Sequence, residues 1–278
     1  MKIAFFGTPD FTVSFLETLK EHVLSPSLVV TNPDRPSGRG MTLKAPGPKV
    51  WGQENDIKVL QPEKLNDEFF EELSKESWDL FVVIAYGKII PERVINLPKY
   101  GTINVHYSLL PKYRGATPVE SAILNGDKKT GIAIQQMRYE LDSGPIFVSE
   151  EVSIDPTDTT PTLREKLNSV AIKLLPSVIK SIFDETIKAQ EQAGEASHCK
   201  KISKEEGEIN LNEEATTNDR KYRAYFGSIG TYFFQNDRRI KITKAHLEWD
   251  LSAQAGQFVI EEVIPENGKK VSYENLSS

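Results

Sequence analysis

Residues 104–118 read NVHYSLLPKYRGATP, and two side chains in this stretch are of types that take part in catalysis. Asn104 and His106 stand two residues apart at the end of an apolar run, so in an extended strand both point to the same face. An amide donates hydrogen bonds to a developing oxyanion, and an imidazole accepts and returns a proton near neutral pH. This pair is therefore the first candidate site.

The carboxylate that would complete such a site is Asp142, in the segment MRYELDSGPI. An aspartate can orient or ionise the imidazole and relay a proton, and the trio of Asn104, His106 and Asp142 needs no enzymatic nucleophile. That combination suits direct acyl transfer from a donor to a substrate amine. From spacing alone a structural explanation stays open, in which the amide caps the strand, the imidazole is hydrogen-bonded in a loop and the carboxylate belongs to a turn.

Other catalytic motifs are absent from the sequence. It has no Walker loop, no nucleophile elbow with Ser, His and Asp in order, and no metal-ligand spacing. The only cysteine, Cys199, rules out an internal disulfide, and with four scattered histidines we expect no metal. No run approaches membrane-spanning length and the first residues lack a signal-peptide pattern, so we expect a cytoplasmic protein without a membrane partner. We also expect a monomer.

The first half of the chain alternates short apolar runs with helix-like or Pro/Gly-rich pieces. This pattern predicts strands at 2–6, 27–30, 57–60, 79–85, 101–105, 130–137 and 145–154. Near-continuous apolar runs between helices are typical of a mostly parallel sheet with helices on both faces, a Rossmann-like α/β domain. Ligands bind such sheets beyond the carboxyl ends of the strands, where both NVH and AYGKIIP lie. The turn GTPDF lacks the spaced glycines of a dinucleotide site, so a dehydrogenase loses support.

The second half of the chain changes in character. We expect a long helix over 160–188, with one apolar side made of Leu163, Leu167, Val170, Leu174, Val178 and Ile182. Residues 189–203 have little apolar periodicity and are interpreted as a linker. Two β-rich runs around QNDRR then predict a hairpin. The expected organisation is a catalytic domain at 1–188 and a small β-barrel domain at 204–278.

The net charge and the local charge of the chain point in opposite directions about a nucleic-acid partner. The formal net charge of -6 argues weakly against such a partner, because phosphate binding relies on lysine and arginine. Locally the balance is reversed: residues 31–49 hold four basic side chains against Asp34 alone, and residues 220–246 hold seven against Asp237. Either run alone is also explained as a solvated face.

The stretch NVHYSLLPKYRGATP followed by LDSG resembles the core motif of the 10-formyltetrahydrofolate-dependent formyltransferases. Similar segments are FFGTPDF, NPDRPSGRGMTLKAPGPKV, VVIAYGKIIP and KISKEEGEIN, so the resemblance covers nearly the whole chain. Within that superfamily the chain looks most like the members that formylate the methionyl group of initiator tRNA. The resemblance implies 10-formyltetrahydrofolate as the formyl donor, methionyl initiator tRNA as the acceptor and no metal.

The resemblance also implies roles for particular residues. Asn104 and His106 would stabilise the tetrahedral adduct formed when the methionyl α-amine attacks the formyl carbon, while Asp142 sets the histidine charge and helps move the amine proton. A flat folate would lie in an apolar slot with fixed polar groups, formed by Ser108, Leu109, Leu110, Pro111 and main-chain groups of Ala85, Tyr86, Gly87 and Lys88. The expected tRNA contacts are in the family insertion that enters the acceptor stem, at Arg35, Arg39, Lys44 and Lys49.

The carboxy-terminal domain resembles the family's OB-like module, an architecture that commonly binds oligonucleotides. Several positions depart from the family pattern: Tyr107 stands where glycine is usual, Leu211 replaces an aromatic residue, and the last domain is short. A sugar-nucleotide N-formyltransferase shares the trio and remains an alternative, although the basic 32–49 loop favours tRNA. A catalytically idle RNA-binding relative is the other alternative.

Overall fold

The computed structural model describes residues 1–37, 41–250 and 255–277. The chain divides into two compact units, which we describe separately. The first unit contains Met1–Arg114, Ile132–Glu150 and Asn168–Ala196, and the second contains Gly115–Gly131, Glu151–Leu167 and Ser197–Ser278. Because the chain crosses between the units several times, the contiguous boundaries expected at 188 and 204 stay a prediction.

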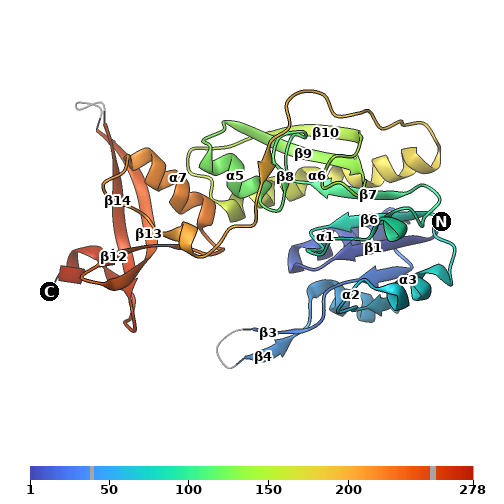
Figure 1. Ribbon diagram of the computed structural model, residues 1–278, viewed down its shortest axis with the longest axis horizontal. Helices are drawn as coiled ribbons and strands as arrows, with labels where there is room; N and C mark the ends of the chain where they lie inside the picture. The colour runs from blue at the N-terminus through green and yellow to red at the C-terminus, as the bar shows by residue number, and fades with distance from the viewer. Residues whose placement is uncertain (38–40, 251–254, 278) are drawn as a thin grey trace. The chain divides into compact units, whose positions relative to one another are not determined.

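The main sheet has seven strands in the order β10-β9-β7-β6-β1-β2-β5 (Figure 1). Their bounds are β1 Ile3–Gly7, β2 Leu28–Val30, β5 Lys58–Leu60, β6 Leu80–Ile84, β7 Thr102–His106, β9 Lys129–Gln136 and β10 Ile146–Ser153. The neighbours from β7 to β5 pair in parallel, whereas β9 pairs antiparallel with β7. Every residue of β1 and β6 is buried, as expected for strands covered on both faces. The predicted α/β fold class is confirmed, with each predicted strand within about one residue of its observed bounds.

The helices of the first unit are α1 Val13–Glu21, α2 Gly47–Glu54, α3 Asp67–Ser74 and α4 Glu92–Ile95. Helix α5, Pro118–Leu124, belongs to the second unit, and α6, Thr160–Phe183, begins in the second unit and continues into the first. The predicted long helix is present, but it ends at Phe183 rather than 188, since Glu185 adopts a left-handed backbone with φ 54°. Its buried side also differs from the prediction, because the stripe follows four-residue steps through Ala171 and Leu175, and leaves Val170 and Leu174 half-buried.

The second unit contains a four-stranded antiparallel sheet in the order β12-β13-β14-β15. Its strands are β12 Thr231–Gln235, β13 Arg238–Asp250, β14 Ala255–Pro265 and β15 Val271–Ser272. The hairpin predicted around QNDRR is confirmed, with Asn236 and Asp237 both at positive φ, as a two-residue type I′ turn requires. Helix α7, Ala215–Tyr225, also belongs to this unit, and the sequence did not predict it because it is mostly polar.

Two segments of the first unit have more regular structure than the sequence indicated. The glycine- and proline-rich stretch after β2 contains a short hairpin of β3, Arg35–Ser37, and β4, Thr42–Lys44, which extends away from the main sheet (Figure 1). The expected linker is tied to β10, because Gln190 and Ile146 exchange two backbone hydrogen bonds of 2.7 and 2.9 Å.

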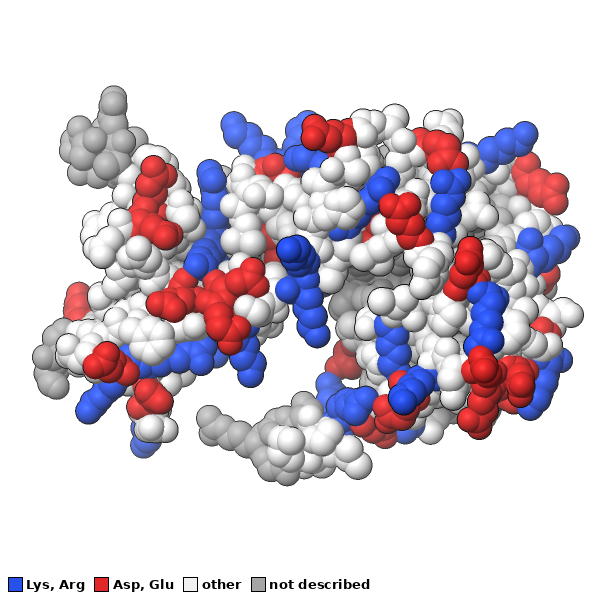
Figure 2. Space-filling view, viewed as in Figure 1, with Lys and Arg blue, Asp and Glu red and all other residues white. Residues whose placement is uncertain are grey.

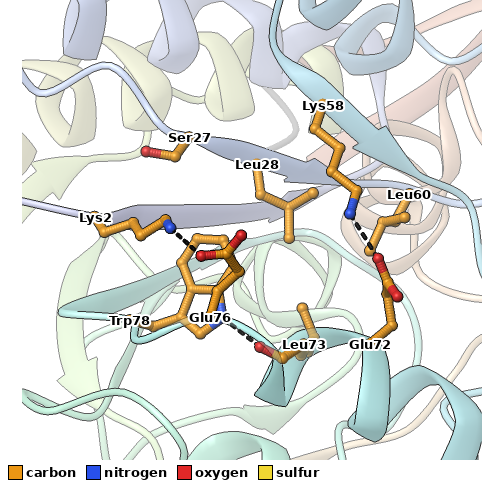
Figure 3. A pocket seen from close by; sticks show the side chains of 9 residues that line it. All are labelled: Lys2, Ser27, Leu28, Lys58, Leu60, Glu72, Leu73, Glu76 and Trp78. Atoms are coloured by element: carbon orange, nitrogen blue, oxygen red, sulfur yellow. Dashed lines mark hydrogen bonds and ion pairs between the residues drawn. The ribbon is translucent and has the colours of Figure 1, made fainter.

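A small hollow of about 60 Å³ lies near the amino-terminal ends of β1, β2 and β5 (Figure 3). Its charged side chains pair with one another: Lys2 with Glu76, and Lys58 with Glu72 at 2.6 Å. The Trp78 indole donates to the carbonyl of Leu73 at 2.8 Å and forms the apolar wall. We interpret these contacts as a brace that holds α3 against the strand ends.

This brace predicts a pH-dependent contribution to stability. Hydrogen bonds from Lys58 and Lys75 lower the pKa of Glu72 from 4.5 to about 2. A folded-state pKa below the unfolded value means that the contribution is present above pH 4.5 and is lost as the pH falls toward 2. Glu72→Gln should therefore be less stable than the wild type at pH 7, and the difference should shrink through that interval. Urea unfolding at pH 7, 4.5 and 3 measures it, with Glu68→Gln on the same helix as the control.

Candidate active site

Strand β7 carries the first two members of the trio. Asn104 and His106 alternate with the buried Val105, so both side chains leave the same face of the sheet. On the antiparallel neighbour β9, Gln135 stands directly opposite Asn104. These two amides therefore lie side by side at the edge where the parallel part of the sheet ends.

The third member, Asp142, approaches this face from the connection between β9 and β10. Residues 138–146, which include the first residue of β10, are here called the Asp142 turn. Its Oδ1 accepts from the Gln135 amide at 2.8 Å and, more weakly, from the Asn104 amide at 3.5 Å. Its Oδ2 faces Nδ1 of His106 at 3.6 Å. The carboxylate is 10 % exposed and the imidazole 5 %. The three side chains proposed from sequence thus meet around one shielded carboxylate.

The backbone of the Asp142 turn is constrained. Asp142 itself has φ 50°, a left-handed conformation that aspartate tolerates better than most residues. Gly144 lies against β9 so closely that a Cβ there would stand 1.7 Å from the carbonyl oxygen of Gln136. That glycine is therefore needed for close approach of two backbone segments.

The two ring nitrogens of His106 face different partners. Nε2 lies 2.9 Å from the carbonyl oxygen of Tyr113, which can only accept, so the network assigns the proton to Nε2. In the neutral ring this leaves the lone pair on Nδ1, on the side of Asp142. Nδ1 is therefore the atom that can take up a proton, and an imidazolium formed there would face the carboxylate.

Tyr107, the departure from the family pattern, contacts Asn168 and Phe11. Its hydroxyl donates to Oδ1 of Asn168 on α6 at 2.7 Å, and its ring packs edge to face on Phe11 at 6.2 Å. Tyr107 is the first residue after β7, and these two contacts hold its phenol against α6 and the segment after β1.

The segment proposed to contact folate forms a tight loop after β7. Ser108 is fully buried and its hydroxyl donates to the carbonyl of Lys112, while Leu110 is 8 % exposed and Leu109 and Pro111 are half-buried. Arg114, which ends this loop, is half-buried and donates to the side-chain oxygen of Gln192. The loop thus combines apolar side chains with a rigid polar frame.

The second proposed folate segment follows β6. Ala85 has φ 48° and Gly87 φ 82°, and both are exposed, whereas the Tyr86 side chain between them is 2 % exposed. The Tyr86 carbonyl accepts from Thr8 and Asn32, each at 3.1 Å. Burial raises the pKa of the Tyr86 phenol. Lys88 turns away to donate to the carbonyls of Pro62 and Glu63, and burial lowers its pKa.

The residues proposed to contact tRNA lie in and beside the β3–β4 hairpin. Arg35 and Lys44 are exposed and pair with Glu63 at 3.1 Å and Asp10 at 2.5 Å. Lys49, on α2, is half-buried and pairs with Asp34 at 2.8 Å. Hydrogen bonds from Gln61 and then Lys49 lower the pKa of Asp34. Arg39 lies outside the described residues.

A hollow of about 650 Å³ runs along α3 and is lined by four glutamates, two lysines and several uncharged residues. Neither this hollow nor the smaller one described above includes a member of the trio. In the described parts of the chain no cluster of three or more His, Cys, Asp or Glu side chains is placed to hold a metal ion. No helix within those parts has the length and apolar character that crossing a membrane requires.

The comparisons with known proteins agree with this fold. A formyl transferase family model matches residues 1–179, and a formyl transferase C-terminal domain model matches residues 201–268. The N-formyltransferase from Helicobacter canadensis, solved with folinic acid and dTDP-3-aminofucose, superimposes with a TM-score of 0.69 over 94% of this chain and 98% of its own, at 19% identity. The family models over most of the chain identify it as a formyl transferase, and the superposition shows the same fold.

Sequence similarity to curated relatives identifies the family within the formyl transferases. The methionyl-tRNA formyltransferase of Thermodesulfovibrio yellowstonii is 39% identical over 88% of this chain and 80% of its own length. That of Sulfurihydrogenibium sp. is 40% identical over 93% and 85%. The chain belongs to the methionyl-tRNA formyltransferase family.

Two residues that hold Asp142 were not predicted from sequence. Gln135 is 1 % exposed, and a signal for it was available, since it precedes the Asp142 turn at the end of a predicted strand. Gln192 donates to the carbonyls of Asp142 and Gly144, both at 2.8 Å. No sequence signal pointed to Gln192, because its segment lacks apolar periodicity and is about fifty residues from Asp142 in the sequence.

Proposed function

We propose that this chain transfers a formyl group from 10-formyltetrahydrofolate to the α-amino group of methionyl initiator tRNA. One observation carries the site assignment: Asn104, His106 and Asp142 converge on one face, with contacts of 3.5 and 3.6 Å to the same carboxylate. An acyl transfer needs a donor for the developing oxyanion and an acceptor for the amine proton. This constellation supplies both.

The residues present fit a formyl donor and an amine acceptor. Among the described residues, the side-chain oxygens of Gln135 and Asn32 are buried without a hydrogen-bond partner, one beside Asp142 and the other beside the Tyr86 carbonyl. Buried acceptors of this kind require a donor, which an amine or a heterocycle N–H supplies. The exposed backbone of Ala85 and Gly87 offers further polar groups to a flat ring.

The chemistry is then divided among the three side chains. The folate supplies a formyl group on a nitrogen that serves as the leaving group. The Asn104 amide has two N–H groups, and its long contact to Asp142 uses at most one, so the other can donate to the oxyanion. Nδ1 of His106 takes the proton of the attacking amine, and Asp142 stabilises the resulting imidazolium. Return of that proton to the folate nitrogen completes the transfer.

Two kinds of observation support tRNA as the acceptor. Both relatives described above carry methionyl-tRNA in their names. The cations of the β3–β4 hairpin, Arg35 and Lys44, are held only by exposed ion pairs, which are weak and can exchange for phosphate. On the second unit, β13 begins with Arg238 and Arg239, and Figure 2 shows lysine and arginine side chains gathered on this unit among acidic ones.

The experiment that tests the function gives the purified protein 10-formyltetrahydrofolate and one of two acceptors. Methionyl initiator tRNA is expected to gain the mass of a formyl group, whereas an amino-sugar nucleotide is expected to remain unchanged. Formylation of the sugar instead would replace the proposed acceptor, and formylation of neither would refute a transferase. The cytoplasmic location and the monomeric state stay predictions.

The double variant Arg35→Ala/Lys44→Ala is expected to bind tRNA more weakly and with less dependence on salt. Each lost phosphate contact should reduce the slope of log affinity against log salt by about 0.7–0.9. Binding titrations at several salt concentrations measure this slope. Transfer to a small methionyl ester should be unaffected, because no residue of the trio changes.

A matched control for this variant is Lys20→Ala/Lys99→Ala, which removes two exposed lysines outside the hairpin. Equal slopes in the hairpin variant and this control would remove the hairpin from the tRNA interface. The proposed contacts of Arg39 and Lys49 are tested in the same way by single substitutions.

A further inference from the structure

Three consecutive residues of the expected linker hold the Asp142 turn. Gln190 pairs with Ile146 through the backbone, and Glu191 forms a two-armed ion pair with Arg138. The next residue, Gln192, donates its side-chain N–H groups to the carbonyls of Asp142 and Gly144, at 2.8 Å each. Segment 190–192 therefore contacts the Asp142 turn at both ends, Arg138 and Ile146, and at Asp142 itself.

The other end of the Gln192 amide is also engaged. Its oxygen accepts from Nε and Nη2 of Arg114, at 3.1 and 2.7 Å. The amide orientation is fixed, because its NH₂ faces two carbonyls and its oxygen faces a guanidinium. Arg114 directly follows Tyr113, whose carbonyl holds Nε2 of His106. One side chain thus connects the turn that carries Asp142 to the loop that orients the imidazole.

We propose that Gln192 is a positioning residue of the formyl-transfer site, which sets the placement of Asp142 relative to His106. The inference rests on the proposed function. The 3.6 Å separation between Nδ1 and Oδ2 is longer than a good hydrogen bond, so a small shift of the turn decides how strongly the carboxylate stabilises an imidazolium. Asp142 has a left-handed backbone conformation, which is less favourable than the extended or right-handed ones. Contacts from other residues must therefore hold it in place.

The first test compares Gln192→Ala with Gln190→Ala. The control changes an exposed side chain two positions away, while the backbone pairing of Gln190 with Ile146 can persist. Loss of the amide is expected to lower kcat by about 10- to 100-fold, the scale of an ångström-level misplacement, with KM for both substrates nearly unchanged. The control should keep wild-type kcat. Wild-type kcat in Gln192→Ala would overturn the proposal.

A second comparison separates positioning from general stability. In an Asp142→Asn background, adding Gln192→Ala should lower kcat no further, because residues that act through one group are not additive. A further decrease in kcat of similar size in that background would mean that Gln192 does not act through Asp142, and would overturn the proposal. Gln192→Glu keeps a partner for Arg114 but loses the donors to the two carbonyls, so it should behave like Gln192→Ala. Wild-type behaviour of Gln192→Glu would also overturn the proposal.

A third readout does not depend on activity. The ring signals of His106 in an NMR spectrum, assigned by their loss in His106→Ala, report the position of the neighbouring carboxylate. They should move in Gln192→Ala and stay in place in Gln190→Ala. Unmoved signals would overturn the proposal even if the chain transferred no formyl group, whereas moved signals without any transfer would count against the proposed function alone.

Discussion

His106→Ala is expected to lower the rate of formyl transfer by about 10² to 10⁴ fold while the protein remains folded. The imidazole is the group whose Nδ1 can take up the amine proton, and alanine leaves nothing in its place. Asp142→Asn should lower the rate by a factor in the same range, because an amide cannot stabilise an imidazolium as a carboxylate does. Single-turnover rates with charged tRNA measure both losses, and thermal melting shows whether the fold persists.

His22→Ala is the matched control, because His22 is exposed at the end of α1 and hydrogen-bonds only locally to Thr18. The double variant His106→Ala/Asp142→Asn should be little slower than either single variant, as expected for groups that act as a unit. Equal rates in the wild type and His106→Ala would eliminate the mechanism. Losses that multiply in the double variant would mean that the two residues act independently.

Gly144→Ala is the second change with a large expected effect. The added Cβ would stand 1.7 Å from the backbone oxygen of Gln136, a clash that no side-chain rotation relieves. The Asp142 turn must therefore move away from β9, and with it the carboxylate. We expect transfer to fall by about 10² fold or more and the free energy of unfolding to fall by about 1–3 kcal/mol, the range for overpacking.

Ser143→Ala serves as the control in the same turn, because it removes only a hydroxyl that donates to the carbonyl of Glu140. Its rate should stay close to that of the wild type. The decisive measurement pairs the rate of transfer with a urea unfolding curve for each variant. Full activity in Gly144→Ala would show that the turn can shift without consequence and that the carboxylate is not needed at its observed place.

The sequence predicted most of the main sheet because its strands are apolar and its helices amphipathic. It also predicted that Asn104 and His106 share a face, which follows from strand geometry alone. Asp142 was only a candidate on residue grounds, since nothing local shows which loop returns to a strand end. The resemblance to a family supplied that link, and the contacts at 3.5 and 3.6 Å agree with it.

The sequence could not predict elements whose stability comes from distant contacts. Helix α7 has few apolar residues, and its buried face is recognisable only once Tyr222 is seen in the second unit's core. The β3–β4 hairpin is made of glycine, proline and charged residues, which local patterns assign to a loop. Segment 190–192 was interpreted as a linker for the same reason, although its side chains hold the site together.

The two oxygens of Asp142 are not equivalent, and each has a different task. Oδ1 is occupied by the amides of two neighbouring strands, whereas Oδ2 is turned toward the imidazole. In the proposed mechanism the positive charge that forms on the imidazole would therefore face Oδ2, while Oδ1 keeps the carboxylate in register with β7 and β9.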